Sequence, residues 1–311
     1  KNQPGILCIE ETPFYAESGG QIGDIGAIKS RGGLFEVRDT RVINNIHLHI
    51  GELVEGEIRD GEKVEAKINT DTRTNTTIHH SATHLLHAAL RYELGKGVGQ
   101  KGSYVAANRM RFDFSYPEAI SDFQLRKIET LVNSKIRENL EVETRIMDTS
   151  DAINSGAIAF FDEKYGDKVR VLSMGDFSIE LCGGTHVSQT GELGYFKILS
   201  ESSIGSGTRR IEALCGVEAE RHASRIEKLV KTISSTLETS EVKILDKLSS
   251  LIEEKSNLES EVKKYKESSL DDVVNAVYDR AEEINNVKLV FAQLNNVEPK
   301  ELRRLVDNLK N

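Results

Sequence analysis

The sequence lacks the features that mark secreted and membrane proteins. It contains three cysteines in 311 residues, Cys8, Cys182 and Cys215. They are too few and too far apart for a disulfide framework, which indicates a reducing compartment and hence the cytoplasm. No apolar run approaches the roughly 20 residues of a membrane span, and the amino-terminal KNQPGILCIE has no signal-peptide pattern. We therefore expect a cytoplasmic protein without a membrane partner and, because the chain does not begin with methionine, a part of a longer protein.

Basic residues are also in short supply. The 41 lysines and arginines are outnumbered by 50 acidic residues, which gives a net charge of −9, and neither side of residue 216 is basic. Net charge governs solubility and non-specific binding, whereas a local basic patch can still hold a phosphate backbone. If a nucleic acid is the partner, we expect the protein to recognise a specific feature of it over a modest area.

The first two thirds of the chain predict a β domain followed by an α+β domain. Residues 1–70 read as short strands separated by glycine-rich turns, which predicts a small β-barrel-like domain. Residues 71–216 mix helical apolar spacing with strands, which predicts an α+β domain. Within this domain we expect a helix over 73–95, a strand over 103–116 and a helix over 122–139, followed by further antiparallel strands.

The residues after 216 have a different character. From Ile226 to Tyr265, apolar residues recur with the alternating three-and-four spacing of a coiled-coil seam. The phase breaks at residues 238–240, which predicts either a helical hairpin or one helix with a stutter. We interpret residues 217–269 as a helical (coiled-coil) dimerisation arm. Two helices that pack only on their own chain would give the same pattern.

The last 42 residues predict too little structure for a domain of their own. We expect a helix over 270–284, a strand over 287–294 and a helix over 299–309. One strand and two helices bury too little apolar surface to be stable alone. Residues 270–311 are therefore interpreted as a truncated α/β piece of a C-terminal globular domain.

Two pairs of metal-ligand residues stand out in the α+β region. Cys182 and His186 flank a Gly-Gly-Thr turn in LCGGTH, and His80 and His84 lie four apart on the predicted helix, where both rings project from one face. Either pair alone would fit a buried cysteine and ordinary histidines. Together they form a CysHis₃ set, and imidazole with thiolate suits zinc better than magnesium or calcium. We predict a Zn²⁺ site.

The neighbouring histidines and the chemistry of the site are less determined. His79 points about 100° away from His80 on the helix, so we expect it to lie outside the site, while His87 shares the face of His84 and is open between a supporting role and none. Four protein ligands are typical of a structural zinc ion, whereas a catalytic ion keeps an open position. The sequence leaves both possibilities open.

Two further motifs are candidates for substrate contact. In ETPFYAESGGQIGDIG, two glycines allow close approach of the backbone and Gln21 offers both a donor and an acceptor. In SIGSGTRRIEA, Arg209 and Arg210 follow a Ser-Gly loop and are candidates to hold a phosphate. A plain turn and a solvated strand end are the alternatives.

The four motifs ETPFYAESGGQIGD, HHSATHLLHAAL, CGGTH and GTRRIEA, in this order and at these separations, resemble the editing portion of the alanyl-tRNA synthetase family. The resemblance extends over essentially the whole chain. Threonyl-tRNA synthetases have a related editing core, but the first motif and the long helical arm favour the alanine family. Free-standing trans-editing proteins of that family are the alternative.

The resemblance implies an aminoacyl-tRNA deacylase that hydrolyses mischarged Ser-tRNA(Ala) and Gly-tRNA(Ala), with the acceptor end of tRNA(Ala) as its partner. It implies that His80, His84, Cys182 and His186 bind Zn²⁺ and that Gln21 lies beside the aminoacyl group. Thr185 is a further candidate for contact with the serine hydroxyl, and Arg209 and Arg210 for contact with tRNA. No segment reads as an aminoacylation site, so we expect editing without charging of tRNA. A homo-oligomer formed through the helical arm is expected. The alternative is a tRNA-binding and dimerisation module with a structural zinc ion.

Overall fold

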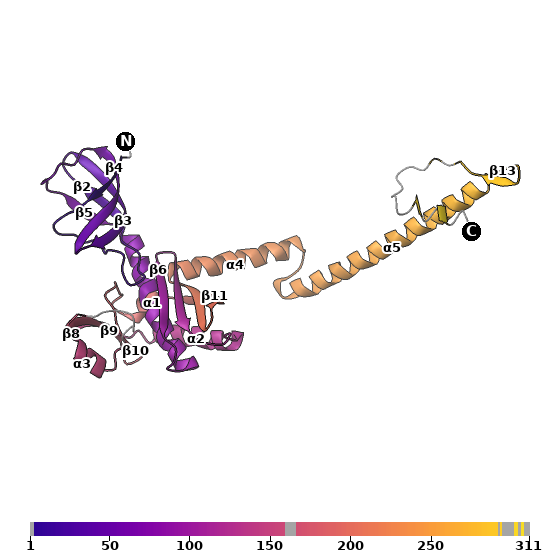
Figure 1. The fold of residues 1–311 in the computed structure, drawn as a ribbon. Coiled ribbons are helices and arrows are strands. Elements are labelled where there is room, and N and C mark those ends of the chain that lie inside the picture. The colour runs from indigo at the N-terminus through magenta and orange to yellow at the C-terminus, as the bar shows by residue number, and fades with distance from the viewer. Residues whose placement is uncertain (1–2, 159–165, 292, 294–301, 304–305, 308–311) are drawn as a thin grey trace. The chain divides into compact units, whose positions relative to one another are not determined.

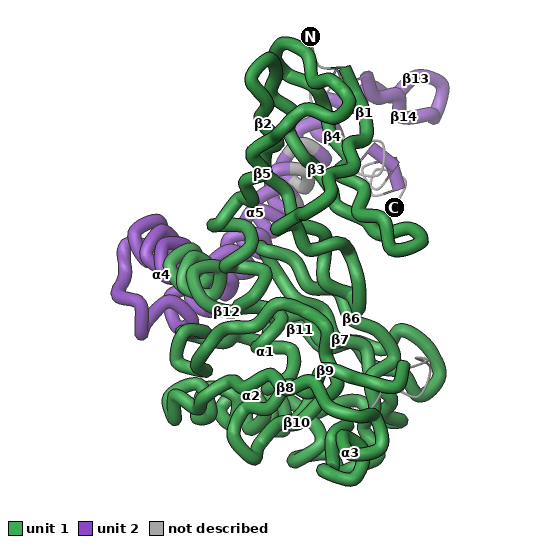
Figure 2. Tube along the Cα trace, turned by 90° about the vertical axis from the view of Figure 1, so that its left-hand side faces the viewer, with its two compact units in different colours: residues 1–225 green, residues 226–311 purple. Residues whose placement is uncertain are grey.

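The computed structural model describes residues 3–158, 166–291, 293, 302–303 and 306–307. The chain divides into two compact units, residues 1–225 and 226–311, which Figure 2 distinguishes by colour. Helices and antiparallel sheets make up the first unit, which confirms the α+β interpretation. In the described part of the chain, no helix combines the length and the hydropathy that crossing a membrane requires.

The amino-terminal strands form one five-stranded antiparallel sheet in the order β1-β4-β3-β2-β5. The strands are β1 (Gln3–Leu7), β2 (Gly26–Lys29), β3 (Gly33–Ile43), β4 (Ile46–Gly56) and β5 (Glu65–Ile68). Alternation along β3 buries Phe35 and Val37 against Phe14 and Ile28. The β-barrel-like prediction is wrong for the described residues: β1 and β5 stay at opposite edges, and no ladder joins these two short strands to close the sheet.

The second part of the first unit is built around helix α1 (Thr70–Leu94), whose first turn is capped by the Asn69 side chain. Its buried face packs on α2 (Asp122–Arg137) and on a four-stranded sheet of order β11-β12-β7-β6. These strands are β6 (Gln100–Ala106), β7 (Arg109–Ser115), β11 (Phe196–Gly205) and β12 (Thr208–Cys215). The single strand predicted over 103–116 is instead the β6–β7 hairpin, because the chain reverses at Ala107–Asn108.

A second, three-stranded antiparallel sheet of order β10-β9-β8 carries the CGGTH motif. It consists of β8 (Val142–Asp148), β9 (Lys168–Met174) and β10 (Ser178–Leu181), with the short helix α3 (Thr149–Asn154) packed against it. Because β10 ends at Leu181, Cys182 is the first residue of the following loop. The short helical turn η1 (Thr190–Leu193) leads from that loop into β11.

The glycine-rich motif contacts the second part of the unit by pairing with β6, the edge strand of the four-stranded sheet. Val105 of β6 donates its amide hydrogen to the Gly20 carbonyl at 2.7 Å and accepts one from Ile22 at 3.0 Å. Gly20 has a φ of +85°, and a Cβ there would lie 2.1 Å from Ser103 Oγ. The close approach therefore requires glycine at this position, and it brings Gln21 to the side of α1 where the histidines lie.

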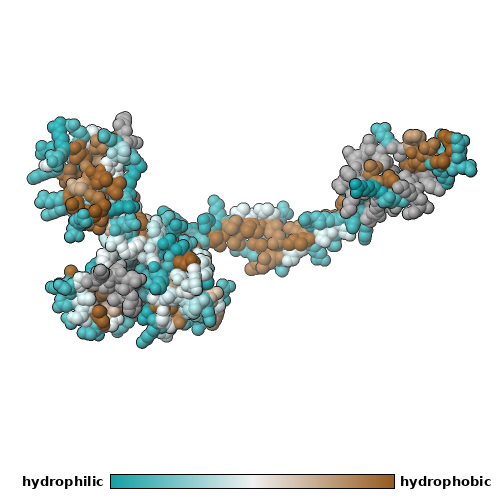
Figure 3. Space-filling view, viewed as in Figure 1, coloured by the Kyte–Doolittle hydropathy of each residue, from teal (hydrophilic) through white to brown (hydrophobic). Residues whose placement is uncertain are grey.

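Two helices make up most of the chain from Val217 to Tyr278 (Figure 1). Helices α4 (Val217–Thr236) and α5 (Ile244–Tyr278) are separated by a break that includes the predicted phase change and a short 3₁₀ turn, η2 (Glu241–Lys243). Apolar side chains gather in this helical region (Figure 3), and many of them are exposed, including Leu229, Leu251 and Leu258. A coiled-coil partner therefore stays a prediction.

The carboxy-terminal prediction needs two corrections. The helix expected over 270–284 ends at Tyr278, and Glu282–Ile284 forms strand β13 instead. The expected strand over 287–294 is represented by β14 (Val287–Leu289), which pairs with β13. Tight pairing is possible because Asn285 and Asn286 both adopt positive φ angles. Most of the helix expected over 299–309 lies outside the described residues.

Candidate metal centre

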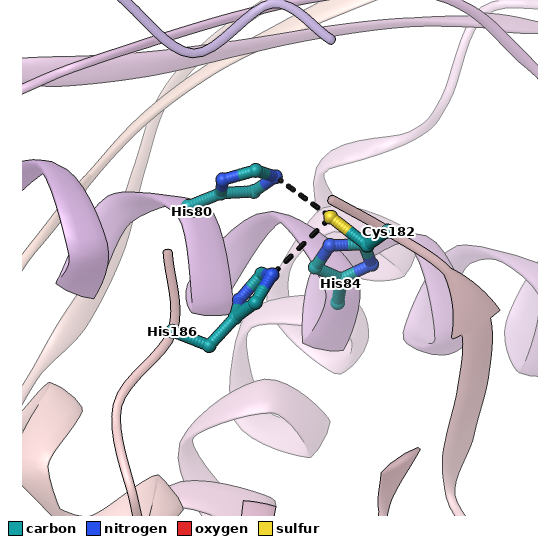
Figure 4. Close-up of side chains that lie close together, drawn as sticks. All are labelled: His80, His84, Cys182 and His186. Carbon is teal, nitrogen blue, oxygen red and sulfur yellow. Dashed lines mark hydrogen bonds between the residues drawn. The ribbon is translucent and has the colours of Figure 1, made fainter. Parts of the chain in front are cut away.

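The four predicted ligands meet at one point (Figure 4). His80 and His84 project from the same face of α1, while the loop after β10 brings Cys182 and His186 opposite them. The Cys182 sulfur lies 3.4 Å from His80 Nε2 and 3.2 Å from His186 Nε2. One ligand atom of each residue lies within 4.8 Å of those of the other three. That spacing suits tetrahedral coordination with bonds of about 2.0–2.3 Å.

Each histidine of the cluster is oriented by a contact at its other ring nitrogen. His80 Nδ1 donates to Gln21 Oε1 at 2.6 Å, and His84 Nδ1 donates to Glu180 Oε2 at 2.7 Å. His186 Nδ1 lies 3.2 Å from Ser81 Oγ. Such outer contacts fix the ring so that Nε2 presents its lone pair to a metal ion. The residues present therefore fit a metal ion held by three Nε2 atoms and one thiolate.

His84 supplies an independent observation in favour of a bound ion. Its Nε2 atom is buried and has no hydrogen-bond partner among the described residues. A buried polar atom without a partner is costly, so such atoms are rare in native proteins. A metal ion at the centre of the cluster would satisfy this atom.

Glu180 is the residue that the sequence analysis missed. Its carboxylate is 1% exposed and accepts hydrogen bonds from His84 Nδ1 and, at 3.0 Å, from His87 Nδ1. His87 is thus linked to the centre through Glu180, which resolves its open role in favour of support. The position of Glu180 in the sequence could have indicated its role. Glu180 lies on β10 two residues before Cys182, so in an extended chain the two side chains point to the same side.

The electrostatics favour the ligand forms of Cys182 and His186. Burial opposes ionisation of Glu180, but His84 and His87 hold the pKa of its carboxyl well below its usual range. Burial also opposes the Cys182 thiolate, yet the charge of His84 and the hydrogen bonds from the surrounding histidines lower its pKa to about 2. Burial lowers the pKa of His186 to about 3. A thiolate and a neutral imidazole are the forms that bind metal ions. His84 differs: burial opposes its protonation, but the charges of Glu180 and Cys182 raise its pKa to about 10, so a metal ion would have to displace a proton from it.

Gln21 and Thr185, the two residues predicted to contact the substrate, lie together beside His80. Gln21 is fully buried; its Nε2 donates to Thr185 Oγ1 at 3.0 Å, and its Oε1 accepts from the Thr185 amide at 3.0 Å. Thr77 Oγ1 lies 2.8 Å from Thr185 Oγ1 and extends the polar group. The buried carboxylate of Asp24 anchors the segment that carries Gln21. It accepts a hydrogen bond from Arg73 Nε of α1 at 2.8 Å.

The other candidates lie outside the cluster. His79 is buried, and its Nε2 accepts the Cys215 amide at 3.1 Å, which confirms that it is not part of the centre. Arg209 and Arg210 lie on β12, and each meets a carboxylate. Arg209 pairs with Glu201, and Arg210 donates to both oxygens of Asp113 at 2.7 and 2.8 Å. Neither guanidinium is in the cluster.

Comparison with known proteins shows which proteins the chain resembles. The chain is 46% identical to an alanine–tRNA ligase of Nitrosococcus oceani and to one of Haemophilus influenzae, and 44% identical to one of Pseudoalteromonas translucida. Each alignment covers 99% of the chain. The chain is homologous to alanine–tRNA ligases. It spans only 35–36% of the length of these ligases.

Two family models match parts of the same sequence. The threonyl and alanyl tRNA synthetase second additional domain matches residues 169–212, and the class II (A) tRNA synthetases match residues 1–72. The first match contains β9, β10 and the loop with Cys182 and His186. The second contains the glycine-rich motif with Gln21. Homology to alanine–tRNA ligases therefore includes both segments that build the centre around α1.

Replacement of Glu180 tests the outer support of the centre. We expect Glu180→Gln to lower zinc affinity about 10- to 100-fold, because a carboxylate that orients a ligand histidine contributes that much. Glu143→Gln, at a half-buried position of β8 outside the cluster, is the matched control and should leave the affinity unchanged. Competition titration with a chromogenic chelator measures both. Equal affinities for the two variants would contradict the role of Glu180.

Proposed function

We propose that this chain is the editing part of an alanine–tRNA ligase and hydrolyses the ester bond of mischarged Ser-tRNA(Ala) and Gly-tRNA(Ala) in a zinc-dependent reaction. One observation carries the proposal. The Nε2 atoms of His80 and His186 converge on the Cys182 sulfur in a chain homologous to alanine–tRNA ligases. Cys182 and His186 lie within the match to a domain that threonyl and alanyl synthetases share. The proposed domains are residues 1–70, 71–216, 217–269 and 270–311.

Zinc is the proposed metal ion, held by His80, His84, Cys182 and His186. A bound zinc ion supplies Lewis-acid polarisation of an ester carbonyl or orients the attacking water. The protein contributes a fixed frame: His80 and His84 are buried, Cys182 and His186 are half-buried, and the three rings are held by Gln21, Glu180 and Ser81. The protein has no need to form a covalent intermediate in this scheme.

The polar group beside His80 is the proposed selectivity element. A synthetic site for alanine rejects the smaller glycine poorly, and an apolar pocket rejects one added hydroxyl poorly. A second site must therefore recognise the serine hydroxyl through polar groups. Gln21 and Thr185 offer an amide and a hydroxyl next to the proposed ligand His80, with Thr77 adjacent. These groups would hydrogen-bond the seryl side chain.

The acceptor end of tRNA(Ala) is the proposed partner, with Arg209 and Arg210 as proposed contacts. Because both guanidinium groups are engaged by carboxylates, a phosphate would have to compete with Glu201 or Asp113. A homo-oligomer through residues 217–269 is also proposed. The exposed row of Leu251, Leu258 and Val262 on α5 supports it, because such a row is buried when two helices pair.

A deacylation assay tests the proposal. We expect the zinc-loaded chain to release serine from Ser-tRNA(Ala) rapidly while Ala-tRNA(Ala) stays intact. The reason is that the polar group beside His80 can hydrogen-bond the side-chain hydroxyl of serine, which alanine lacks. Time courses of labelled amino acid remaining on tRNA measure both reactions. Serine release no faster than without protein, by folded chain with zinc bound, would refute the function.

A non-catalytic module that binds tRNA and dimerises is the second candidate. The observation in its favour is that four protein ligands are available, which is typical of structural zinc. His84→Ala separates the two candidates. If the variant folds and binds tRNA but hydrolyses nothing, the centre is catalytic. If the variant unfolds, and the wild-type chain unfolds when zinc is removed, the ion is structural.

A further inference from the structure

The outer face of the four-stranded sheet carries an aromatic–arginine cluster that the proposed function does not use. On β7, the core residues Met110 and Phe112 alternate with Arg109 and Arg111, so the two arginines face away from α1. Tyr104 of β6 stands directly opposite Arg111 in the ladder and is 36% exposed. We call Tyr104, Arg109 and Arg111 the Tyr104 patch.

The two guanidinium groups of the patch share one ring. The Cζ atoms of Arg109 and Arg111 each lie 5.8 Å from the centroid of the Tyr104 ring. Planar arginine groups and an aromatic side chain are what proteins use to stack on unpaired bases and to hold the adjoining phosphates of RNA. A local positive cluster is notable in a chain with a net charge of −9.

The charge of the patch is less neutralised than that of the arginines on β12, although Glu212 of β12 stands opposite Arg111 in the ladder. Among the residues that the structure describes, Arg109 forms no ion pair. Arg111 Nε is buried without a hydrogen bond, and its nearest carboxylate oxygen, Asp113 Oδ2, lies 3.8 Å away. That carboxylate is already held by two hydrogen bonds from Arg210. Arg109 and the exposed part of the Arg111 side chain, which is 34% exposed, thus keep donors for an anionic ligand.

The patch is continuous with the metal centre through the backbone. Val105, the residue after Tyr104, forms the bridge with Gln21, whose side chain contacts His80. Ser103, the residue before Tyr104, donates to the Gly19 carbonyl at 3.1 Å. The patch faces away from α1, so a ligand whose end reaches Gln21 would contact the patch by passing around the edge of β6.

We propose that the Tyr104 patch binds RNA close to the end that carries the ester, with a base stacked on the tyrosine–arginine cluster and the adjoining phosphates on Arg109 and Arg111. This inference rests on the proposed function, in which that end enters the metal centre. It assigns RNA contact to β6 and β7, whereas the sequence pattern assigned it to Arg209 and Arg210 of β12.

Binding and kinetics of patch variants test the inference. Uncharged tRNA(Ala), labelled for fluorescence anisotropy, is titrated with the zinc-loaded chain at several salt concentrations. We expect Tyr104→Ala to weaken binding about tenfold, as loss of one stacked base does. Arg109→Ala should reduce the salt slope by about 1. Tyr92→Ala and Arg59→Ala, at exposed positions on α1 and beyond β4, are the matched controls and should bind as the wild-type chain does.

A second readout separates RNA contact from damage to the centre. For Tyr104→Ala, we expect the KM for Ser-tRNA(Ala) to rise with kcat unchanged, and hydrolysis of 3′-seryl-adenosine, which is too short to reach the patch, to be unaffected. Wild-type affinity in both patch variants would overturn the inference, as would the absence of any tRNA binding by the wild-type chain. The proposed function fails on a different result, namely no serine release by the wild-type chain.

Discussion

Cys182→Ala is expected to lose the tight zinc site. Zinc sites of this type bind with an apparent free energy of about 10–16 kcal/mol. If the four ligands contribute comparably, loss of the thiolate weakens binding by about 2.5–4 kcal/mol, or roughly two to three orders of magnitude. The Cys182 sulfur contacts two histidines of the cluster and is its one thiol among the described residues. Metal analysis after dialysis against a weak chelator measures the loss.

Cys8→Ala is the matched control for this prediction. Cys8 is a free, exposed cysteine and lies outside the cluster, so the variant should retain one zinc ion per chain. The comparison removes one thiol in each case, and therefore separates a site ligand from non-specific binding of metal to cysteine. Retention of one tightly bound ion by Cys182→Ala would show that the four residues are not the ligand set.

Gly184→Ala is expected to disable the centre without touching a ligand. A Cβ at this position would lie 2.0 Å from His80 Cε1 and 2.9 Å from Gln21 Oε1. His80 is buried on α1, and Arg170 donates to the Gly184 carbonyl, so neither side can easily give way. Overpacking of this kind costs about 1–3 kcal/mol. Displacement of His80 should also weaken zinc binding about as much as loss of a ligand does.

Gly183→Ala provides the control for Gly184→Ala, because a Cβ at Gly183 meets no atom within 4 Å. We expect this variant to keep its zinc affinity and its Tm. Thermal unfolding with and without zinc distinguishes the two neighbours: zinc should raise the Tm of Gly183→Ala as in the wild-type chain and have little effect on Gly184→Ala. The same zinc-dependent rise in both variants would show that the packing of Gly184 against His80 is not required.

The sequence predicts the ligands of the centre well because local spacing determines them. A spacing of four residues places His80 and His84 on one face of the helix, and a glycine turn brings His186 back towards Cys182. The outer contacts depend on tertiary packing instead. Glu180 reads as an ordinary strand residue until β10 is placed beside α1.

The predictions that were wrong also concern features that depend on tertiary packing or on turns without a clear sequence signal. Closure of a barrel depends on whether the edge strands β1 and β5 pair, which short strands and glycines do not determine. The β6–β7 hairpin was read as one strand because its turn, Ala107–Asn108, lacks the glycine that normally marks such a turn. The prominence of Arg209 and Arg210 in sequence did not reveal that the sheet places Glu201 and Asp113 against them.

The most direct test of the central claim is the rate of serine release from Ser-tRNA(Ala) as zinc is returned to chelator-treated chain. The folded state is followed in parallel by circular dichroism. We predict that the metal-free chain stays folded and inactive, and that activity rises linearly to a plateau at one equivalent of zinc, because one CysHis₃ cluster holds one ion. Full activity of the folded, metal-free chain would contradict the account.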